Sequence, residues 1–304
     1  MLWIYGGGYY LGSTDLYPAQ ILAAFNDVIV VTVNYRLNIF GFFSGPGSGL
    51  VPNLGLWDQH LAMLWVKNNI DDYGGDSSSV TLFGESAGGS AVIQQMFSPH
   101  NDLDLFQRVI SESAYLLGMT VLNRDTSRDI KTLAKALDCG SAQLVSCMKE
   151  KTTSQLLLAS YKQPIYFYPV ADDDYLPKDL GYMMSNFTAF GVNDMVRNNI
   201  NSFAKFDLFG GWNNQNGLLF MGNLLSVSEA VAGKDLTNGV DDRVLHRALS
   251  GYPFEHLSGT DVSDGGEALT TIINFYMQDV GLDASKNRSV SDRRVEAFMK
   301  ITGT

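Results

Sequence analysis

A short glycine-rich turn between an apolar strand and a helix constrains the fold of this chain more than any other feature. The pentapeptide Gly-Glu-Ser-Ala-Gly at residues 84–88 directly follows the apolar run 80–83, and a helical pattern then continues over residues 87–97. A serine on a tight strand-to-helix turn is held in a strained backbone conformation, so small residues are needed two positions to either side. We therefore expect an α/β fold in which the hydroxyl of Ser86 projects from the edge of a sheet.

The same turn predicts a site that stabilises an oxyanion. A helix that begins after Ser86 directs its free N–H groups and the positive end of its dipole at the serine, so the N–H of Ala87 is the natural first donor. Further donors must come from a second loop, and the triple glycine at residues 6–8 follows the expected strand 2–5. Bare backbone can approach a substrate there, and such a loop lies upstream of the nucleophile in this pattern. Together the two motifs favour acyl transfer through Ser86, without a metal or cofactor.

Strands and helices alternate in the first half of the chain, which predicts a mostly parallel sheet. The expected strands are residues 2–5, 28–34, 80–83 and 108–111, and the expected helices pass through residues 61–68 and 87–97. The second half shows helical patterns at residues 125–137, 142–151, 242–249 and 267–280, with a short strand at 206–209. Because no low-complexity linker separates the halves, we expect a single domain over residues 1–304 with helical insertions.

Composition narrows the classes of function. With 304 residues, 45% hydrophobic and 17% charged, the chain can bury a large core. The net charge of -11 and the absence of a Lys/Arg stripe argue against a nucleic-acid partner. No apolar run approaches the roughly 20 residues of a membrane span, and no secretion signal precedes the first strand.

Cysteines and sequons give weaker hints about the compartment. Seven residues separate Cys139 from Cys147, a spacing that allows either a small disulfide loop or two free thiols. Glycosylation sequons begin at Asn186 and Asn287 and hint at export.

Six motifs, taken in order, resemble the type B carboxylesterase family, which includes cholinesterases, bile-salt-activated lipases and the non-catalytic neuroligins. The motifs are Trp-Ile-Tyr-Gly-Gly-Gly-Tyr-Tyr at residues 3–10, Val-Asn-Tyr-Arg at 33–36, Asn-Leu-Gly-Leu-Trp-Asp-Gln at 53–59, Trp-Val-Lys-Asn-Asn-Ile at 65–70, Gly-Gly-Asp at 74–76 and Phe-Gly-Glu-Ser-Ala-Gly-Gly at 83–89. The resemblance implies an α/β-hydrolase, with a mostly parallel central sheet and helices on both faces. It also implies a small-molecule or lipid carboxylic ester as substrate, and a secreted or extracellular location.

The resemblance assigns roles to particular residues. It implies Ser86 as the nucleophile, Gly7, Gly8 and Ala87 as the oxyanion donors, and Glu85 as a buried acidic neighbour that supports the site. It further implies a disulfide between Cys139 and Cys147. Neuroligins lack the serine, so its presence favours an esterase over a catalytically inactive cholinesterase-like binding or adhesion protein, which is the alternative.

The chain departs from the family pattern at the acid. The acid position falls on Asn216, in the turn 211–217 after the expected strand 206–209. An amide can accept a hydrogen bond from imidazole but cannot stabilise imidazolium, so activity is expected to fall steeply.

The chain also departs from the pattern at the base, because the family's histidine-glycine motif is absent. His60 and His100 precede the acid turn, which is the wrong chain order for this fold, and His246 lies in a charged helical pattern. His256, beside Glu255, is the remaining weak candidate. We therefore expect a histidine outside this chain to act as the base.

Relatives in this family have further strands before the oxyanion strand and a histidine strand after the acid. We therefore expect this chain to be part of an exported protein, incomplete at both ends; the alternative is a shortened, inactive protein. Aromatic residues such as Tyr9, Tyr10, Trp57 and Tyr115 could line a substrate gorge, but we expect them to pack in the core.

Overall fold

The computed structural model describes residues 1–45, 49–102, 104–114, 122–123, 126–140, 143–162, 165, 167–178 and 205–213. The chain divides into two compact units. The first comprises Met1–Leu117 and Val121–Gly211, and the second comprises Gly118–Thr120 and Trp212–Thr304. Every helix and strand described below belongs to the first unit.

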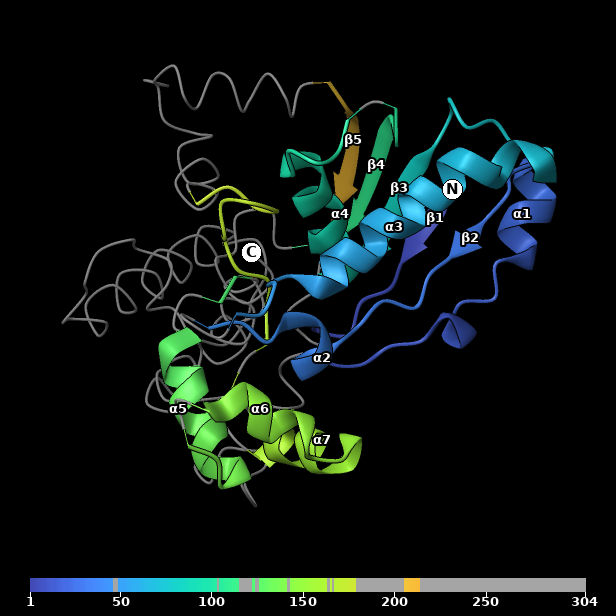
Figure 1. Ribbon diagram of the computed structural model, residues 1–304. Helices are drawn as coiled ribbons and strands as arrows, with labels where there is room; N and C mark the ends of the chain where they lie inside the picture. The colour runs from blue at the N-terminus through green and yellow to red at the C-terminus, as the bar shows by residue number, and fades with distance from the viewer. Residues whose placement is uncertain are drawn as a thin grey trace, which may run out of the picture. The chain divides into compact units, whose positions relative to one another are not determined.

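The centre of the first unit is a five-stranded sheet in which every pair of neighbours is parallel (Figure 1). The strand order is β2-β1-β3-β4-β5. The bounds are Leu2–Ile4 for β1, Val31–Thr32 for β2, Thr81–Glu85 for β3, Arg108–Glu112 for β4 and Asp207–Gly211 for β5. This confirms the expected α/β fold with its parallel sheet.

The central strands are buried because helices cover a parallel sheet, which requires apolar residues in succession rather than in alternation. All three residues of β1 are buried, as are Leu82 and Phe83 of β3. The edge strand β2 is shorter than the expected 28–34. It pairs with β1 at two positions, where Leu2 lies opposite Val31 and Trp3 lies opposite Thr32.

The helix that follows the serine has the expected bounds, Ala87–Phe97, and is labelled α4. The helix expected through residues 61–68 is longer, because α3 covers Leu54–Asn69. The remaining helical elements are η1 (Thr14–Leu16), α1 (Gln20–Asn26), α2 (Asn38–Phe42), η2 (Ile70–Tyr73), α5 (Thr126–Leu137), α6 (Leu144–Lys149) and α7 (Thr153–Lys162). The sequence patterns predicted α5 and α6 but missed α1, α2 and α7; the helices expected at 242–249 and 267–280 lie outside the described residues.

A disulfide joins Cys139, after α5, to Cys147 in α6, with the two Cα atoms 6.0 Å apart. This confirms the pairing implied by the family resemblance. Leu133 and Leu137 of α5 and Leu144 of α6 are buried in the hydrophobic core, so apolar packing accompanies the covalent link. The disulfide therefore fixes the connection between two short helices.

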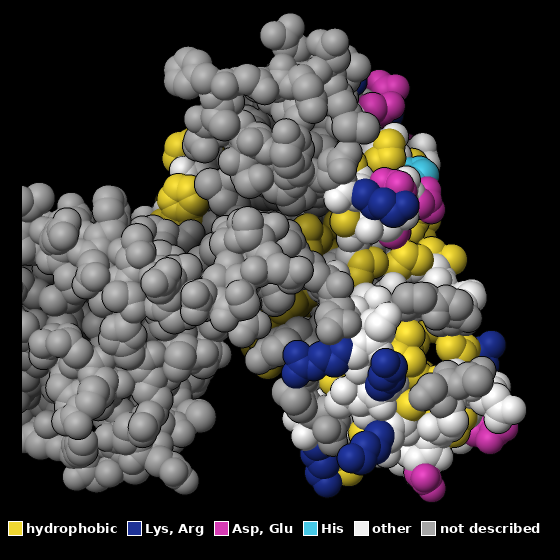
Figure 2. All heavy atoms as spheres, turned by 90° about the vertical axis from the view of Figure 1, so that its left-hand side faces the viewer, with side chains coloured by type: hydrophobic (Ala, Val, Ile, Leu, Met, Phe, Trp, Pro, Cys, Tyr) yellow, Lys and Arg dark blue, Asp and Glu magenta, His cyan; other side chains and the backbone are white. Residues whose placement is uncertain are grey.

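The charge of the chain is unevenly distributed. Residues 126–162 hold six basic and three acidic side chains, although the whole chain has a net charge of -11. Figure 2 shows Lys and Arg side chains gathered over the lower part of the face that lies on the left of Figure 1, where α5 is drawn. On α5, Arg128, Lys131 and Lys135 recur at three- and four-residue spacing and are exposed. The helical insertion thus presents a basic face on an acidic protein.

Within the described ranges, no helix has both the length and the apolar character needed to cross a bilayer.

Candidate active site

Ser86 lies between the last residue of β3 and the first residue of α4. Its backbone has φ 55° and ψ −122°, a strained conformation for a residue with a side chain. Such strain costs about 1–3 kcal/mol and persists only when neighbouring groups fix it. The Ser86 N–H donates to the Glu112 carbonyl at 2.9 Å, and the Ser86 carbonyl accepts from the Ser90 N–H at 2.9 Å. Strand β4 and helix α4 therefore hold the turn from both sides.

The glycines two residues before and two residues after the serine are required because β1 passes close to the turn. A Cβ placed on Gly88 would lie 2.0 Å from the Ile4 carbonyl oxygen, and one on Gly84 would lie 2.5 Å from the same atom. Ile4 stands opposite Gly84 in the parallel register of β1 and β3. The two glycines thus allow the backbone of the neighbouring strand to pass directly against the turn.

The glycine loop, which we define as residues 6–11, follows β1 and lies against the serine. A Cβ on Gly6 would be 3.0 Å from the Ser86 Cβ and 2.9 Å from Glu85 Oε2. Gly7 has φ 109°, in a region that favours glycine, and its carbonyl accepts from the N–H groups of Tyr10 at 3.0 Å and Leu11 at 3.2 Å. Apart from its chain neighbours, no residue in the described ranges lies within 4 Å of a Cβ built on Gly8.

The first turn of α4 supplies backbone N–H groups close to Ser86. The first N–H groups of a helix have no acceptor within the helix, and they carry its partial positive charge. Ala87 is the first residue of α4 and is only 5% exposed. The glycine loop and the N-terminus of α4 therefore both lie next to the serine. Backbone N–H groups in such a position can stabilise developing negative charge.

Glu85 is half-buried beside the glycine loop. Burial raises the pKa of its carboxyl, and the like charge of Glu112 raises that pKa further. The two residues stand opposite each other in the register of β3 and β4. The carboxyl of Glu85 consequently keeps its proton at a higher pH than an exposed glutamate does.

Two tyrosines extend the glycine loop into other elements. The fully buried Tyr9 donates from its hydroxyl to Gln94 Oε1 of α4 at 3.1 Å. The Tyr10 hydroxyl donates to the Ile165 carbonyl and accepts from the Phe167 N–H at 3.0 Å. Tyr9 thus belongs to the core, as expected. The sequence analysis missed these hydrogen bonds, and the pair of tyrosines directly after three glycines is the signal that could have suggested them.

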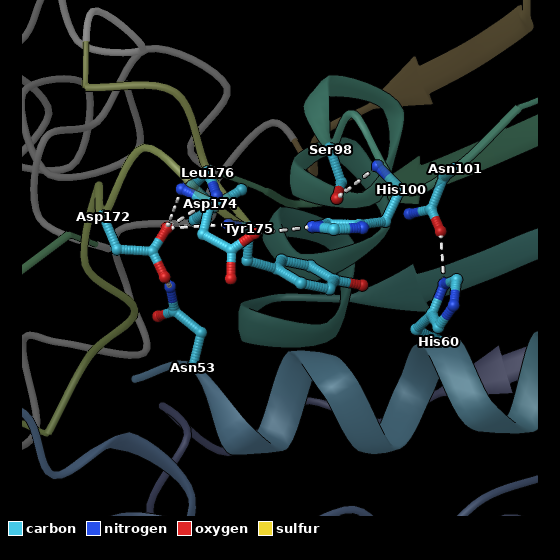
Figure 3. Close-up of polar contacts among 9 residues, drawn as sticks. All are labelled: Asn53, His60, Ser98, His100, Asn101, Asp172, Asp174, Tyr175 and Leu176. Carbon is cyan, nitrogen blue, oxygen red and sulfur yellow. Dashed lines mark hydrogen bonds and ion pairs between the residues drawn. The ribbon is translucent and has the colours of Figure 1, made fainter. Parts of the chain in front are cut away.

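The two described histidines interact with residues other than Ser86 (Figure 3). His60 Nδ1 lies 2.7 Å from Asn101 Oδ1, and His100 Nε2 lies 2.9 Å from Asp174 Oδ1. Asn101 directs its amide nitrogen at Gln95, so its oxygen faces His60 and the His60 Nδ1 carries the hydrogen. Both histidines have structural partners.

Trp57 and Tyr175 pack against the same two histidine rings. The Trp57 ring centroid lies 5.7 Å from that of His60 and 4.6 Å from that of His100. The Tyr175 hydroxyl donates to Gln95 Oε1 at 2.5 Å and lies 3.1 Å from the Leu56 carbonyl oxygen. Trp57 therefore packs in an aromatic cluster at the C-terminal end of α4.

Several sequence predictions fall outside the described residues. These are the acid position Asn216, the weak base candidate His256, His246, the sequons at Asn186 and Asn287, and Tyr115. Among the residues that the structure describes, no three or more His, Cys, Asp or Glu side chains are grouped so that they could hold a metal ion.

The parallel sheet and the serine at the turn between β3 and α4 define the chain as an α/β-hydrolase. Comparison with known sequences gives the family: the profile described as "Carboxylesterase family" matches residues 1–303. The chain belongs to this family.

Individual relatives support the assignment and show that the chain is much shorter than they are. Bovine bile salt-activated lipase is 36% identical over 244 residues, which are 73% of this chain and 38% of the lipase. Rat carboxylesterase 1D is 41% identical over 169 residues, 55% of this chain and 30% of the relative. Human neuroligin-3 is 30% identical over 285 residues, 92% of this chain and 30% of the relative. The chain thus spans well under half the length of these proteins.

Proposed function

We propose that this chain supplies the nucleophile and the oxyanion donors of a serine carboxylesterase, which hydrolyses a small-molecule or lipid carboxylic ester. The observation that carries the proposal is the strained Ser86 with the glycine loop packed against it. Family membership and the bile salt-activated lipase and carboxylesterase relatives support the same reaction class.

In this proposal the Ser86 hydroxyl attacks the carbonyl carbon of the ester and forms an acyl-enzyme. The N–H groups of Gly7, Gly8 and Ala87 donate hydrogen bonds to the oxyanion of each tetrahedral intermediate. A base accepts the serine proton and returns it to the leaving alcohol, and water then hydrolyses the acyl-serine. These steps use only side chains, backbone amides and water.

The base in this proposal comes from outside the described residues. His60 and His100 are bound to Asn101 and Asp174, so we assign neither to the reaction. Within this chain, His256 is the candidate to test, and Asn216 at the acid position would orient imidazole without stabilising its charged form.

We also propose that the protein is exported. The disulfide between Cys139 and Cys147 supports this location, because reducing cytosols keep thiols free.

A catalytically inactive binding protein is the second candidate. Asn216 at the acid position favours it, as does the similarity to neuroligin-3 over 92% of this chain. The two candidates differ in one measurable property, the reactivity of Ser86.

Labelling with a fluorophosphonate ester measures that reactivity. The purified 304-residue chain and its Ser86→Ala variant are treated with the reagent, and the adduct is located by peptide mass. The esterase proposal predicts an adduct on Ser86 that is absent from the variant, with His256→Asn as the next variant to label. Labelling at Ser86 would mean that a base operates within these 304 residues. A chain that is folded by circular dichroism yet remains unlabelled would mean that catalysis depends on residues outside this chain or is lost, as in the binding protein.

A further inference from the structure

We propose that Tyr9 and Tyr10 are positioning residues that hold the amides of the glycine loop at a fixed distance from Ser86. The inference rests on the proposed function, and it concerns the two residues that directly follow the triple glycine. Their side chains bind different elements, Tyr9 on α4 and Tyr10 on the segment after α7.

Tyr9 holds a backbone conformation that a bulky residue seldom adopts. Its φ is 62°, in the left-handed region, and such a conformation persists only where the surroundings fix it. The Tyr9 carbonyl accepts from the Asn38 N–H at 2.7 Å, and its ring packs edge-on against Phe42 with centroids 4.9 Å apart. Both the backbone and the ring of Tyr9 are therefore held in place.

The hydroxyl of Tyr9 links the glycine loop to the helix that begins after the serine. It donates to Gln94 Oε1 at 3.1 Å, and Gln94 lies on α4 about two turns after Ser86. Burial raises the pKa of Tyr9, so the hydroxyl keeps its proton and remains a donor. Because α4 is a continuous helix, this bond sets the position of the loop relative to Ser86.

Tyr10 holds the other side of the loop. Its hydroxyl is bound twice, as a donor to the Ile165 carbonyl and as an acceptor from the Phe167 N–H. The Tyr161 hydroxyl donates back to the Tyr10 carbonyl at 3.4 Å. Hydrogen bonds on both sides thus restrict the loop, whose glycines alone would leave its backbone free to move.

Removal of single hydroxyl groups tests this inference. Tyr9→Phe and Tyr10→Phe keep the rings and delete the hydrogen bonds. Tyr175→Phe is the matched control, because Tyr175 is as fully buried as Tyr9 and its hydroxyl has Gln95 and Leu56 as partners, neither of which belongs to the glycine loop. All three variants are made in the full 304-residue chain.

Hydrogen–deuterium exchange of the peptide that covers residues 6–11 is the first measurement. We expect Tyr9→Phe and Tyr10→Phe each to speed its exchange about fivefold, the factor that corresponds to loss of one hydrogen bond. Tyr175→Phe should leave that peptide unchanged. This result needs no activity, so it tests the positioning role even if Ser86 proves unreactive and the proposed function fails.

The second measurement separates the rate of fluorophosphonate labelling at Ser86 into reagent affinity and maximal rate. Displaced oxyanion amides should lower the maximal rate about fivefold in both loop variants while the affinity stays within about twofold. Unchanged exchange in both loop variants overturns the inference. So does an equal effect of Tyr175→Phe on exchange or labelling, because general destabilisation would then explain the data.

Discussion

Gly88 shows how one missing side chain allows the turn to form. The Ile4 carbonyl of β1 passes so close that a Cβ on Gly88 would lie 2.0 Å away. The contact involves backbone on both sides, so neither partner can move aside cheaply. The sequence motif predicted a glycine here for the turn, and the structure adds the neighbouring strand as the reason.

Gly88→Ala is therefore expected to destabilise the protein by about 3 kcal/mol, the upper range for overpacking a close contact. Urea unfolding followed by tryptophan fluorescence measures the change. Gly140→Ala is the matched control, because none of the described residues other than its chain neighbours lies within 4 Å of a Cβ at Gly140. It should change stability by less than about 0.5 kcal/mol. Equal effects of the two substitutions would contradict the steric explanation.

Glu85 predicts a pH dependence of stability with a defined sign. Burial and Glu112 raise its pKa in the folded protein, so the folded state holds this proton more tightly than the unfolded state. The contribution of Glu85 to the free energy of unfolding is thus greatest at low pH. It declines as pH rises from the ordinary carboxyl range through the raised pKa.

The Glu85→Gln variant should lack this decline. Urea titration across pH 4 to 7 measures the free energy of unfolding of the variant and of wild type. The value for the variant minus the value for wild type should increase as pH rises. Glu112→Gln removes only the like charge and should produce a smaller change in the same direction. Parallel profiles for wild type and Glu85→Gln would show that the carboxyl titrates at its ordinary value.

The element that local sequence describes best is α4. Its observed bounds, Ala87–Phe97, equal those expected, because the strained serine begins the helix and Pro99 follows its end. The five-residue α2 was missed since so short a helix has little intrinsic stability. It depends on burial of Ile39 and Phe42, which no local pattern reveals.

The disulfide between α5 and α6 leads us to expect that its reduction lowers the stability of the protein. Replacing both Cys139 and Cys147 with serine removes the only cross-link among the described residues. The loop is short, so we expect a loss of about 2.5 kcal/mol in urea unfolding. Wild type in dithiothreitol should match the double variant, and insensitivity of wild type to the reductant would contradict the prediction.

At the scale of the whole molecule, Asn53 joins segments that are far apart in the sequence. Its side chain accepts from the Val170 N–H and donates to the Val170 carbonyl, each at 2.8 Å. It also donates to Asp172 Oδ2 at 3.1 Å (Figure 3). The residue is 1% exposed at the start of α3. One buried amide thus holds the segment 167–178 against the first half of the chain.

Asn53→Ala should therefore leave the buried backbone groups of Val170 without partners and lower the free energy of unfolding by about 3 kcal/mol. Asn26→Ala serves as the control, because Asn26 is exposed and its side chain donates to the Leu22 carbonyl within the same helix, α1. Its effect should stay within about 0.5 kcal/mol. A cost for Asn53→Ala as small as that of the control would show that the segment is held by other contacts.

The sequence by itself determined the α/β class, the parallel sheet and the turn that carries Ser86. These follow from apolar runs, glycine placement and helix limits, which act over a few neighbouring residues. Only the tertiary structure decided which partners those residues meet. The Ile4 carbonyl beside Gly88, the Gln94 that binds Tyr9 and the Val170 that binds Asn53 lie 84, 85 and 117 residues away in sequence. Such contacts depend on how the whole chain packs, and no local pattern encodes them.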